Sequence, residues 1–271
     1  MEALKPWMRL WVVFLSYRSF FFGIALTVAC VCSQGLRAQT ALPTMPAPQL
    51  PIATQQSLHY SVDWRVFPAG TVTFKLQAQG TQEHVSATAV SINAVSLLFP
   101  VSDRYEGVFD RAAGCSSEYT KQIQEGYRRF SGQLKLDYAD HLQTLTEKNL
   151  NSGISKQRSG PIPGCVTDVL SGIFYLASLP LQVGHDVSFP LADAGRVIAV
   201  VAKVEAKEQI ITPAGTFSTV RVQPTADAGV VKNRGNIWIW YTDDARHLPV
   251  QVRAHLFWGT ITMQLTSISV P

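Results

Sequence analysis

The stretch Leu58-His59-Tyr60-Ser61-Val62-Asp63-Trp64-Arg65-Val66 decides the fold class of this chain. Apolar and polar residues alternate along it, which is the period of a β-strand with one buried face. Pro68-Ala69-Gly70 follows, and a Pro, a small residue and a Gly in succession favour a tight turn. Alternation resumes from Val72 to Ala78. The two runs therefore predict a β-hairpin with one apolar face and a turn at Gly70.

The same alternation recurs through most of the chain, in runs separated mainly by Gly, Pro, Asp or Asn. The further runs are Tyr105–Asp110, Gln133–Tyr138, Val187–Leu191, Val197–Ala206, Phe217–Val222, Ile237–Tyr241, Val250–Trp258 and Thr260–Ile268. Together the runs predict a mostly all-β fold of ten or more strands, in which a curved antiparallel sheet forms an open barrel or a sandwich. A second Pro-Ala-Gly-Thr tetrapeptide predicts another turn at Gly215, either by convergent turn chemistry or from a duplicated half-domain.

One segment departs from this alternation. Apolar residues between Asp168 and Leu176 fall at a helical spacing, and Thr167 or Asp168 can cap the first turn. We therefore expect one short helix here, which ends at Pro180. An apolar helix must be covered, so we expect it to pack across the concave face of the sheet.

The N-terminus has the order of charged, apolar and small residues that is typical of a secretory signal peptide. Basic residues precede the uncharged run Phe20–Cys32, which is too short to span a bilayer unless Arg18 is included. We predict a signal peptide over residues 1–38 with cleavage after Ala38, and an uncleaved anchor is the alternative. The mature protein is expected to be periplasmic or secreted.

Two further parts are predicted behind the signal peptide: a Pro-rich, extended linker over residues 39–56 and a single β-rich domain over 57–271. Residues 1–38 carry four basic and one acidic side chain, so their removal lowers the formal net charge from +4 by 3 to +1. A domain near neutrality with no basic cluster beyond Arg128-Arg129 is not a nucleic-acid binder.

Cleavage leaves two cysteines, Cys115 and Cys165. An even number of cysteines in an exported protein predicts a disulfide, and two unpaired buried thiols are the alternative. Two cysteines so far apart do not make a zinc site, and the six histidines show no metal-binding spacing. We therefore predict no metal site and no cofactor.

The sequence contains no motif that names a reaction: a nucleophile elbow, a Walker loop and a dinucleotide-binding glycine pattern are all missing from it. We therefore assign no catalytic residue. Asp243 and Asp244 follow the run Ile237–Tyr241, and we expect them to close a turn with Arg246 as a partner. The alternative is a pair of carboxylates with separated pKa values that acts as acid and base.

Aromatic side chains provide the candidates for a binding site. The run Ile237–Tyr241 is apolar on both faces, because Trp238 and Trp240 share one face and Ile and Tyr residues occupy the other. Such a strand either lies between two layers of a core or lines an apolar groove. The candidate ligand-lining residues are Trp64, Trp238, Trp240, Trp258 and Phe174.

The order of several short motifs resembles the bacterial domain-of-unknown-function family numbered 3108. These motifs are Leu58-x-Tyr60-x-Val62-x-Trp64 with Pro68–Thr71, Glu125–Arg129, Asp168–Ser171, Glu208 with Thr212–Phe217, and Trp240 with Asp243–Val250. The resemblance implies an exported envelope protein of antiparallel β architecture with no established activity, and it implies no catalytic residues. At the level of fold alone, the pattern is also similar to the periplasmic lipoprotein carriers, whose curved sheet holds acyl chains over a helix.

These observations favour a non-enzymatic periplasmic protein that binds a lipid or another apolar ligand, or an envelope protein as partner. Two alternatives remain open. One is a cell-envelope hydrolase that uses Asp243, Asp244 or Glu125, and the other is a purely structural scaffold.

Overall fold

The computed structural model of the protein describes residues 42–270 except 53, 234 and 258. The predicted signal peptide over residues 1–38, its cleavage site at Ala38 and the candidate Trp258 lie outside the described residues. In the described part of the chain, no helix is long and apolar enough to cross a bilayer.

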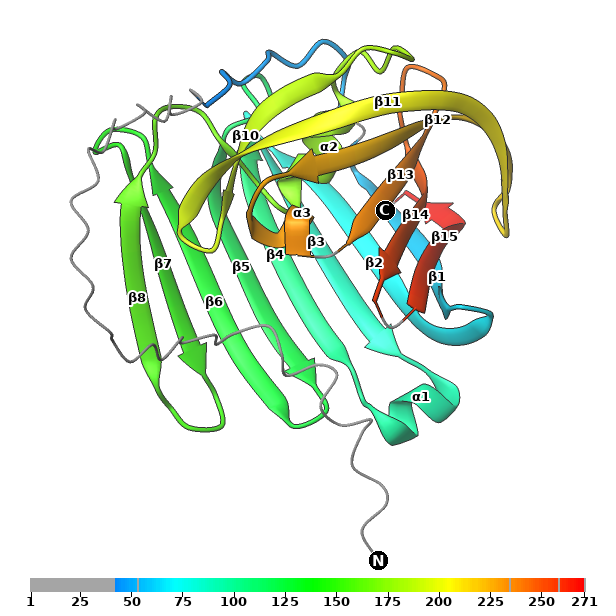
Figure 1. Cartoon of the computed structure of the whole chain (residues 1–271), viewed down its shortest axis with the longest axis horizontal. Helices are drawn as coiled ribbons and strands as arrows, with labels where there is room; N and C mark the ends of the chain where they lie inside the picture. Colours follow the sequence, from blue (N-terminus) through cyan, green and yellow to red (C-terminus); the bar gives the residue numbers. More distant parts are fainter. Residues whose placement is uncertain (1–41, 53, 234, 258, 271) are drawn as a thin grey trace, which may run out of the picture. The chain divides into compact units, whose positions relative to one another are not determined.

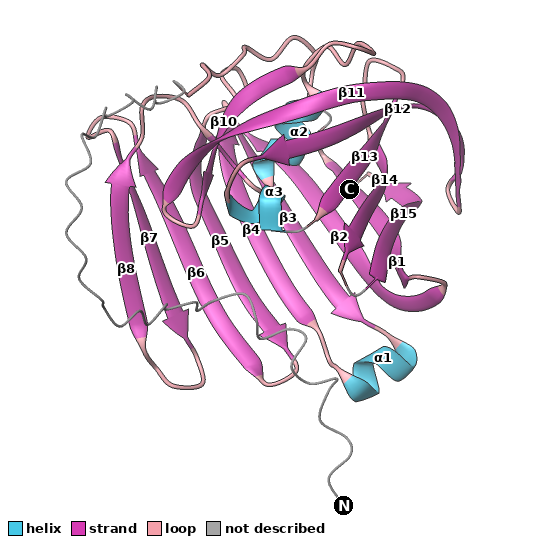
Figure 2. Ribbon diagram, viewed as in Figure 1, coloured by secondary structure: helices cyan, strands magenta, loops and turns pink. Residues whose placement is uncertain are grey.

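Fifteen strands and three short helices make up the described part (Figures 1 and 2). In chain order they are β1 (Gln56–Trp64), β2 (Phe67–Gln79), β3 (Gln82–Ser91), α1 (Asn93–Leu98), β4 (Ser102–Asp110), β5 (Ser116–Glu125), β6 (Arg128–Asp137), β7 (Leu142–Asn149), β8 (Ser155–Pro161), β9 (Thr167–Asp168), α2 (Ser171–Ala177), β10 (Val187–Asp193), β11 (Arg196–Thr212), β12 (Gly215–Ala226), α3 (Gly229–Asn233), β13 (Asn236–Thr242), β14 (Pro249–Leu256) and β15 (Gly259–Ser269).

All strands belong to one sheet in the order β8-β7-β6-β5-β4-β3-β2-β1-β15-β14-β13-β12-β11-β10-β9. Every neighbouring pair is antiparallel except β9 and β10, which are parallel. The prediction of a mostly all-β fold with a curved antiparallel sheet is therefore confirmed. Turns alternate between two edges of the sheet. We call the edge with the β1–β2, β5–β6 and β7–β8 turns the lower edge, as it lies in Figure 1, and the opposite edge the upper edge.

The first hairpin forms as predicted, but the expected turn at Gly70 was wrong. Arg65 and Val66 make the turn, with Arg65 at a φ of 57°, whereas Gly70 lies inside β2. A Cβ atom at Gly70 would lie 2.6 Å from the carbonyl oxygen of Val90, so this glycine permits the close approach of β3. The second tetrapeptide does make a turn, where Gly215 at a φ of 134° begins β12.

The predicted helix is present as α2. It begins at Ser171, three residues after Asp168, where the apolar pattern began. Asp168 caps it: the Asp168 carboxylate accepts hydrogen bonds from the backbone N–H groups of Leu170 (2.8 Å) and Ser171 (2.9 Å). The prediction of a single helix was wrong, since α1 and α3 are also present. Both have only one or two turns, and α1 has no buried residue, so neither carries an apolar stripe that a sequence pattern would reveal.

We call the sheet face that contacts α2 the inner face. The Phe174 ring of α2 packs edge-on against Phe74 of β2 with ring centroids 5.6 Å apart, and Tyr241 donates a hydrogen bond to the Ile173 carbonyl (2.8 Å). Gly107 of β4 lies so close to α2 that an added Cβ would be 2.7 Å from the Ser171 hydroxyl oxygen. The helix therefore fills the upper half of the inner face, as the sequence predicted for an apolar helix.

The two ends of the sheet meet by side-chain packing. Leu134 and Leu145 of β6 and β7 share a buried cluster with Ala192 of β10, and Val197 of β11 packs against it. A cavity of only about 10 Å³ remains at this contact, which is room for no more than a single water molecule. The edge strands β8 and β9 are not hydrogen-bonded to each other, so the sheet is open, although side chains from strands near its two ends share one buried cluster.

Cys115 and Cys165 form a disulfide, as predicted. The bond joins the β4–β5 turn to the segment that leads into β9 and α2. It therefore ties the helix that fills the inner face to the upper edge of the sheet.

The described part of the predicted linker has no helix or strand before β1 and packs on the body of the protein. The Tyr175 hydroxyl donates to the Pro46 carbonyl (2.6 Å), and the Gln49 and Leu50 N–H groups both donate to the Ser178 carbonyl. Ile52 is buried in the core. The packed structure thus begins before the predicted start of the domain at residue 57.

Candidate functional site

Strand β13 separates two different environments. Its residues Ile237, Ile239 and Tyr241 face inward and pack in the cluster that includes α2. Trp238 and Trp240 face outward, because Trp240 is paired directly with Arg221 of β12 and shares its face. The strand therefore lies between two layers. This position is one of the two interpretations that its apolar pattern allowed.

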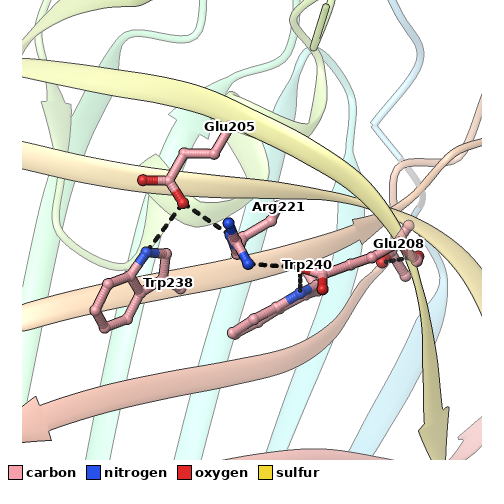
Figure 3. A network of polar contacts seen from close by, with 6 residues as sticks. Glu205, Glu208, Arg221, Trp238 and Trp240 are labelled. Carbon is pink, nitrogen blue, oxygen red and sulfur yellow. Dashed lines mark hydrogen bonds and ion pairs between the residues drawn. The ribbon is translucent and has the colours of Figure 1, made fainter. Parts of the chain in front are cut away.

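A network of polar contacts holds the two indoles on the outer face (Figure 3). The Trp238 indole N–H donates to Glu205 (3.1 Å), and the Trp240 indole N–H donates to Glu208 (2.8 Å). Arg221 bridges both carboxylates, at 2.8 Å from Glu205 and 3.0 Å from Glu208. The network joins the long β11–β12 hairpin to β13.

Contacts on the outer face leave Trp240 little free surface. Trp240 is only 4% exposed, and the guanidinium of Arg253 lies 5.5 Å from its ring centroid. Ala214, in the turn at the tip of the β11–β12 hairpin, donates from its N–H to the Leu265 carbonyl (3.1 Å), so this hairpin is also held at its tip. The outer network therefore holds β11, β12 and β13 together, and we call it the clamp. Its indole N–H groups and Arg221 already have Glu205 and Glu208 as partners.

The lower half of the inner face is different, because apolar side chains there are only half-buried. Inner-face residues next to α2, such as Leu58, Phe74 and Ile239, are buried. Further toward the lower edge the inner-facing side chains retain exposed surface. We call this set the inner apolar face: Val62, Trp64, Val72, Tyr105, Ile237, Val252 and Met263. It is an apolar surface that no other described part of the chain covers completely.

The four described ligand-lining candidates are divided between the two faces of the sheet, although Phe174 and Trp240 belong to the same hydrophobic cluster. Trp64 lies at the lower end of the inner apolar face, whereas Phe174 is 3% exposed within α2 and forms part of the packing above it. Trp238 and Trp240 lie on the opposite face of the sheet. Only Trp64 among the described candidates is thus placed to touch a ligand on the inner face.

The three carboxylates of the hydrolase alternative are also separated. Asp243 and Asp244 lie in the β13–β14 turn at the upper edge, where Asp243 pairs with Lys207 and Asp244 with Arg246, both at 2.7 Å. Although burial raises it, hydrogen bonds and the charge of Arg246 together lower the pKa of Asp244. Glu125 lies at the lower edge.

Sequence reasoning missed an acidic pair on the inner face. Asp103 of β4 is buried and shares a hydrogen bond with Glu125 of β5, which pairs with Arg128 at 3.1 Å. Burial raises the pKa of the Asp103 carboxyl, against hydrogen bonds from the Gln124 N–H and the Tyr105 hydroxyl that lower it. The available signal was the alternation itself, since Asp103 is in phase with the inward residues Tyr105 and Phe109.

The fold defines a class of protein: a largely antiparallel, barrel-like sheet curled around one short helix. The sequence of this chain matches the model of the family described as "Protein of unknown function (DUF3108)" over residues 59–266, and the chain belongs to this family. Among curated proteins, none matches the chain.

Two solved structures match this chain, and the first of them shares its fold. One is a β-barrel-like protein of the domain of unknown function DUF1849 from Brucella abortus, with 9% identity and a TM-score of 0.55, in which the match covers 83% of this chain and 100% of that chain. The other is a protein with a YmcC-like fold from Bacteroides fragilis, with 9% identity, the same coverage of 83% and 100%, and a TM-score of 0.37. At such identities the first likeness concerns the fold alone.

Proposed function

We propose that this protein is an exported, non-enzymatic envelope protein that binds a lipid or another apolar ligand on its inner apolar face. One observation carries the proposal: apolar residues such as Val72 and Met263 point toward the inside of the curled sheet and pack against its core, yet α2 leaves them only partly buried. Contiguous apolar surface that stays uncovered marks ligand-binding grooves and interaction sites.

The disulfide between Cys115 and Cys165 supports export, because disulfides form and persist in oxidising compartments. The predicted signal peptide agrees with this location. The hydrolase alternative has less support, since Asp243 and Asp244 are each neutralised by a cation and Glu125 lies at the other edge of the sheet.

The proposal is tested by purifying the protein from a periplasm, extracting it with organic solvent, and identifying bound molecules by mass spectrometry beside a mock purification. A stoichiometric lipid or isoprenoid is the expected result. Displacement of this ligand by the fluorescent apolar probe N-phenyl-1-naphthylamine then measures binding in solution.

Two variants locate the site. Met263→Gln places a polar group of similar length on the inner apolar face and should weaken probe binding about tenfold. Ile211→Gln changes an exposed apolar side chain at the β11–β12 turn and should leave probe binding unchanged. An empty extract together with equal probe binding by both variants would show that the inner apolar face binds no apolar ligand, and would favour the partner-binding or scaffold alternatives.

A further inference from the structure

Several connections that are distant in sequence lie together at the lower edge of the sheet. Trp64 of β1 is paired with both Phe67 and Ile261, which places the β1–β2 and β14–β15 turns side by side. Val101, which follows α1, is bridged to Glu125 at the start of the β5–β6 turn. Figure 1 shows α1 and the β5–β6 and β7–β8 turns along this edge.

Large apolar side chains at this edge project into solvent. Six of them, from four different connections, are between 62% and 88% exposed: Val66, Phe67, Leu97, Leu98, Tyr127 and Phe257. We call this set the apolar rim. None of these side chains belongs to a core cluster of the described residues, and α1 buries no residue at all. Packing of the described part therefore does not explain why these positions are apolar.

Basic side chains accompany the apolar rim. Arg65, Arg128, Arg129 and Lys148 are exposed at the ends of the same strands and turns. The acidic residues nearby are fewer: Glu125 is largely buried and paired with Arg128, and Asp63 is half-buried. The lower edge therefore combines exposed apolar tips with an excess of positive charge.

The upper edge has the opposite charge balance. Its turns expose Asp137, Asp140, Asp243 and Asp244, of which Asp243 is paired with Lys207 and Asp244 with Arg246, so acidic side chains remain in excess there. A protein with a mature net charge near zero thus places basic and acidic residues at different edges. Such a distribution orients the lower edge toward a negatively charged surface.

We propose that the apolar rim docks this protein onto an anionic phospholipid bilayer. Separate apolar tips on a curved row of turns suit insertion between lipid headgroups, while neighbouring Arg and Lys side chains reach lipid phosphates. A second copy of the chain is a poorer match, because its own lower edge carries the same positive charge. This inference goes beyond the proposed ligand and does not depend on it.

The experiment is cosedimentation of the purified exported protein with vesicles. Vesicles of phosphatidylethanolamine and phosphatidylglycerol should bind the protein, and vesicles of phosphatidylcholine alone should bind it at least about tenfold more weakly. The double variant Leu97→Ser/Leu98→Ser should lower the partition coefficient on anionic vesicles by at least about tenfold. The double variant Arg129→Gln/Lys148→Gln should lower this partition coefficient by a similar factor. Added salt should abolish the difference in partitioning between this variant and the wild-type protein.

Matched controls change the same residue types elsewhere. Ile211→Ser removes an exposed apolar side chain from the β11–β12 turn, and Lys135→Gln removes an exposed cation from β6. Neither should affect partitioning. Equal vesicle binding by the rim and control variants, or a rim variant that changes only the molecular mass in light scattering, would overturn the proposal. Because N-phenyl-1-naphthylamine binding reports on the inner apolar face, failure of the ligand proposal is distinguishable from failure of membrane docking.

Discussion

The upper and lower halves of the inner face are built from the same strands but end in different states. In the upper half, α2 inserts Phe174 against Phe74, and the side chains around it are buried. In the lower half, residues of the same strands, such as Val72 of β2, are only partly buried. The comparison teaches that the alternating apolar pattern determines which side chains lie on the inner face. Whether those side chains are buried depends on whether another element covers them.

The largest expected effect removes the packing of the upper half. Phe174→Ala deletes a ring that is 3% exposed and should lower the free energy of unfolding by about 3–5 kcal/mol, because the rigid surroundings leave a cavity. Urea denaturation followed by tryptophan fluorescence measures this loss. A loss below about 1 kcal/mol would mean that the two halves are equally loosely packed.

Breaking the disulfide should also weaken the upper half. Cys115→Ser opens a loop whose ends are 50 residues apart, and we expect a loss of about 4 kcal/mol in the chain-entropy description. Thermal unfolding with and without reductant gives the measurement. The unfolding temperature of the variant should not change with reductant. If that of the wild-type protein did not change either, the disulfide would not contribute to stability.

The lower half should tolerate truncation. Val72→Ala truncates a partly buried side chain and should lower the free energy of unfolding by about 1 kcal/mol or less. The same urea denaturation tests it, with Val222→Ala in the buried core as the matched comparison. Equal losses in the two valine variants would contradict the difference between the halves.

Protonation of Asp103, in the lower half, should make the free energy of unfolding depend on pH. Because burial raises its pKa in the folded state, the folded protein holds this proton at pH values where the unfolded chain has lost it. The free energy of unfolding then falls as pH rises between the unfolded and folded pKa values, by about 1.4 kcal/mol for each unit of separation. Asp103→Asn should flatten this dependence, whereas the exposed Asp140→Asn should leave it intact.

The smallest effect is expected at the β13–β14 turn of the upper edge. Asp244→Asn weakens an exposed ion pair with Arg246 and should cost about 0.5 kcal/mol, mainly near neutral pH. Since its folded pKa is lowered, its stabilising contribution is present above the unfolded pKa and is lost as pH falls through the folded value. Thermal unfolding at two pH values measures this. A wild-type envelope-hydrolysing activity that Asp244→Asn abolishes without unfolding would favour the hydrolase alternative.

Sequence patterns located ten of the strands, including β1, β2, β11, β12, β14 and β15 by their alternation and β13 by its continuous apolar run. They missed β3, β5, β7, β8 and the two-residue β9. Strand β8, for example, reads Ser155-Lys156-Gln157-Arg158-Ser159-Gly160-Pro161 and has no buried residue. Such strands are held by ladder hydrogen bonds to neighbours, as β8 is to β7, and these bonds use the backbone, which leaves no periodic signal in the side chains.

The candidate site was predicted only in part. The sequence indicated that aromatic residues near β13 matter, but it could not place Trp238 and Trp240 on the outer face and Trp64 on the inner one. A strand that is apolar on both faces has no alternation from which to read its orientation. The clamp formed by Glu205 and Arg221 depends on the register of β11, β12 and β13, which no local pattern encodes.

By itself, the sequence determined the β-rich class, the capped helix after Asp168 and the pairing of Cys115 with Cys165, because each depends on local periodicity, local capping or a count of cysteines. The tertiary structure alone decided what covers each face. It placed α2 over the upper half, left Val72 and Met263 only partly buried below it, and gathered separate apolar turns along one edge. Coverage is set by contacts between residues far apart in the chain, and those contacts follow from strand register and sheet curvature.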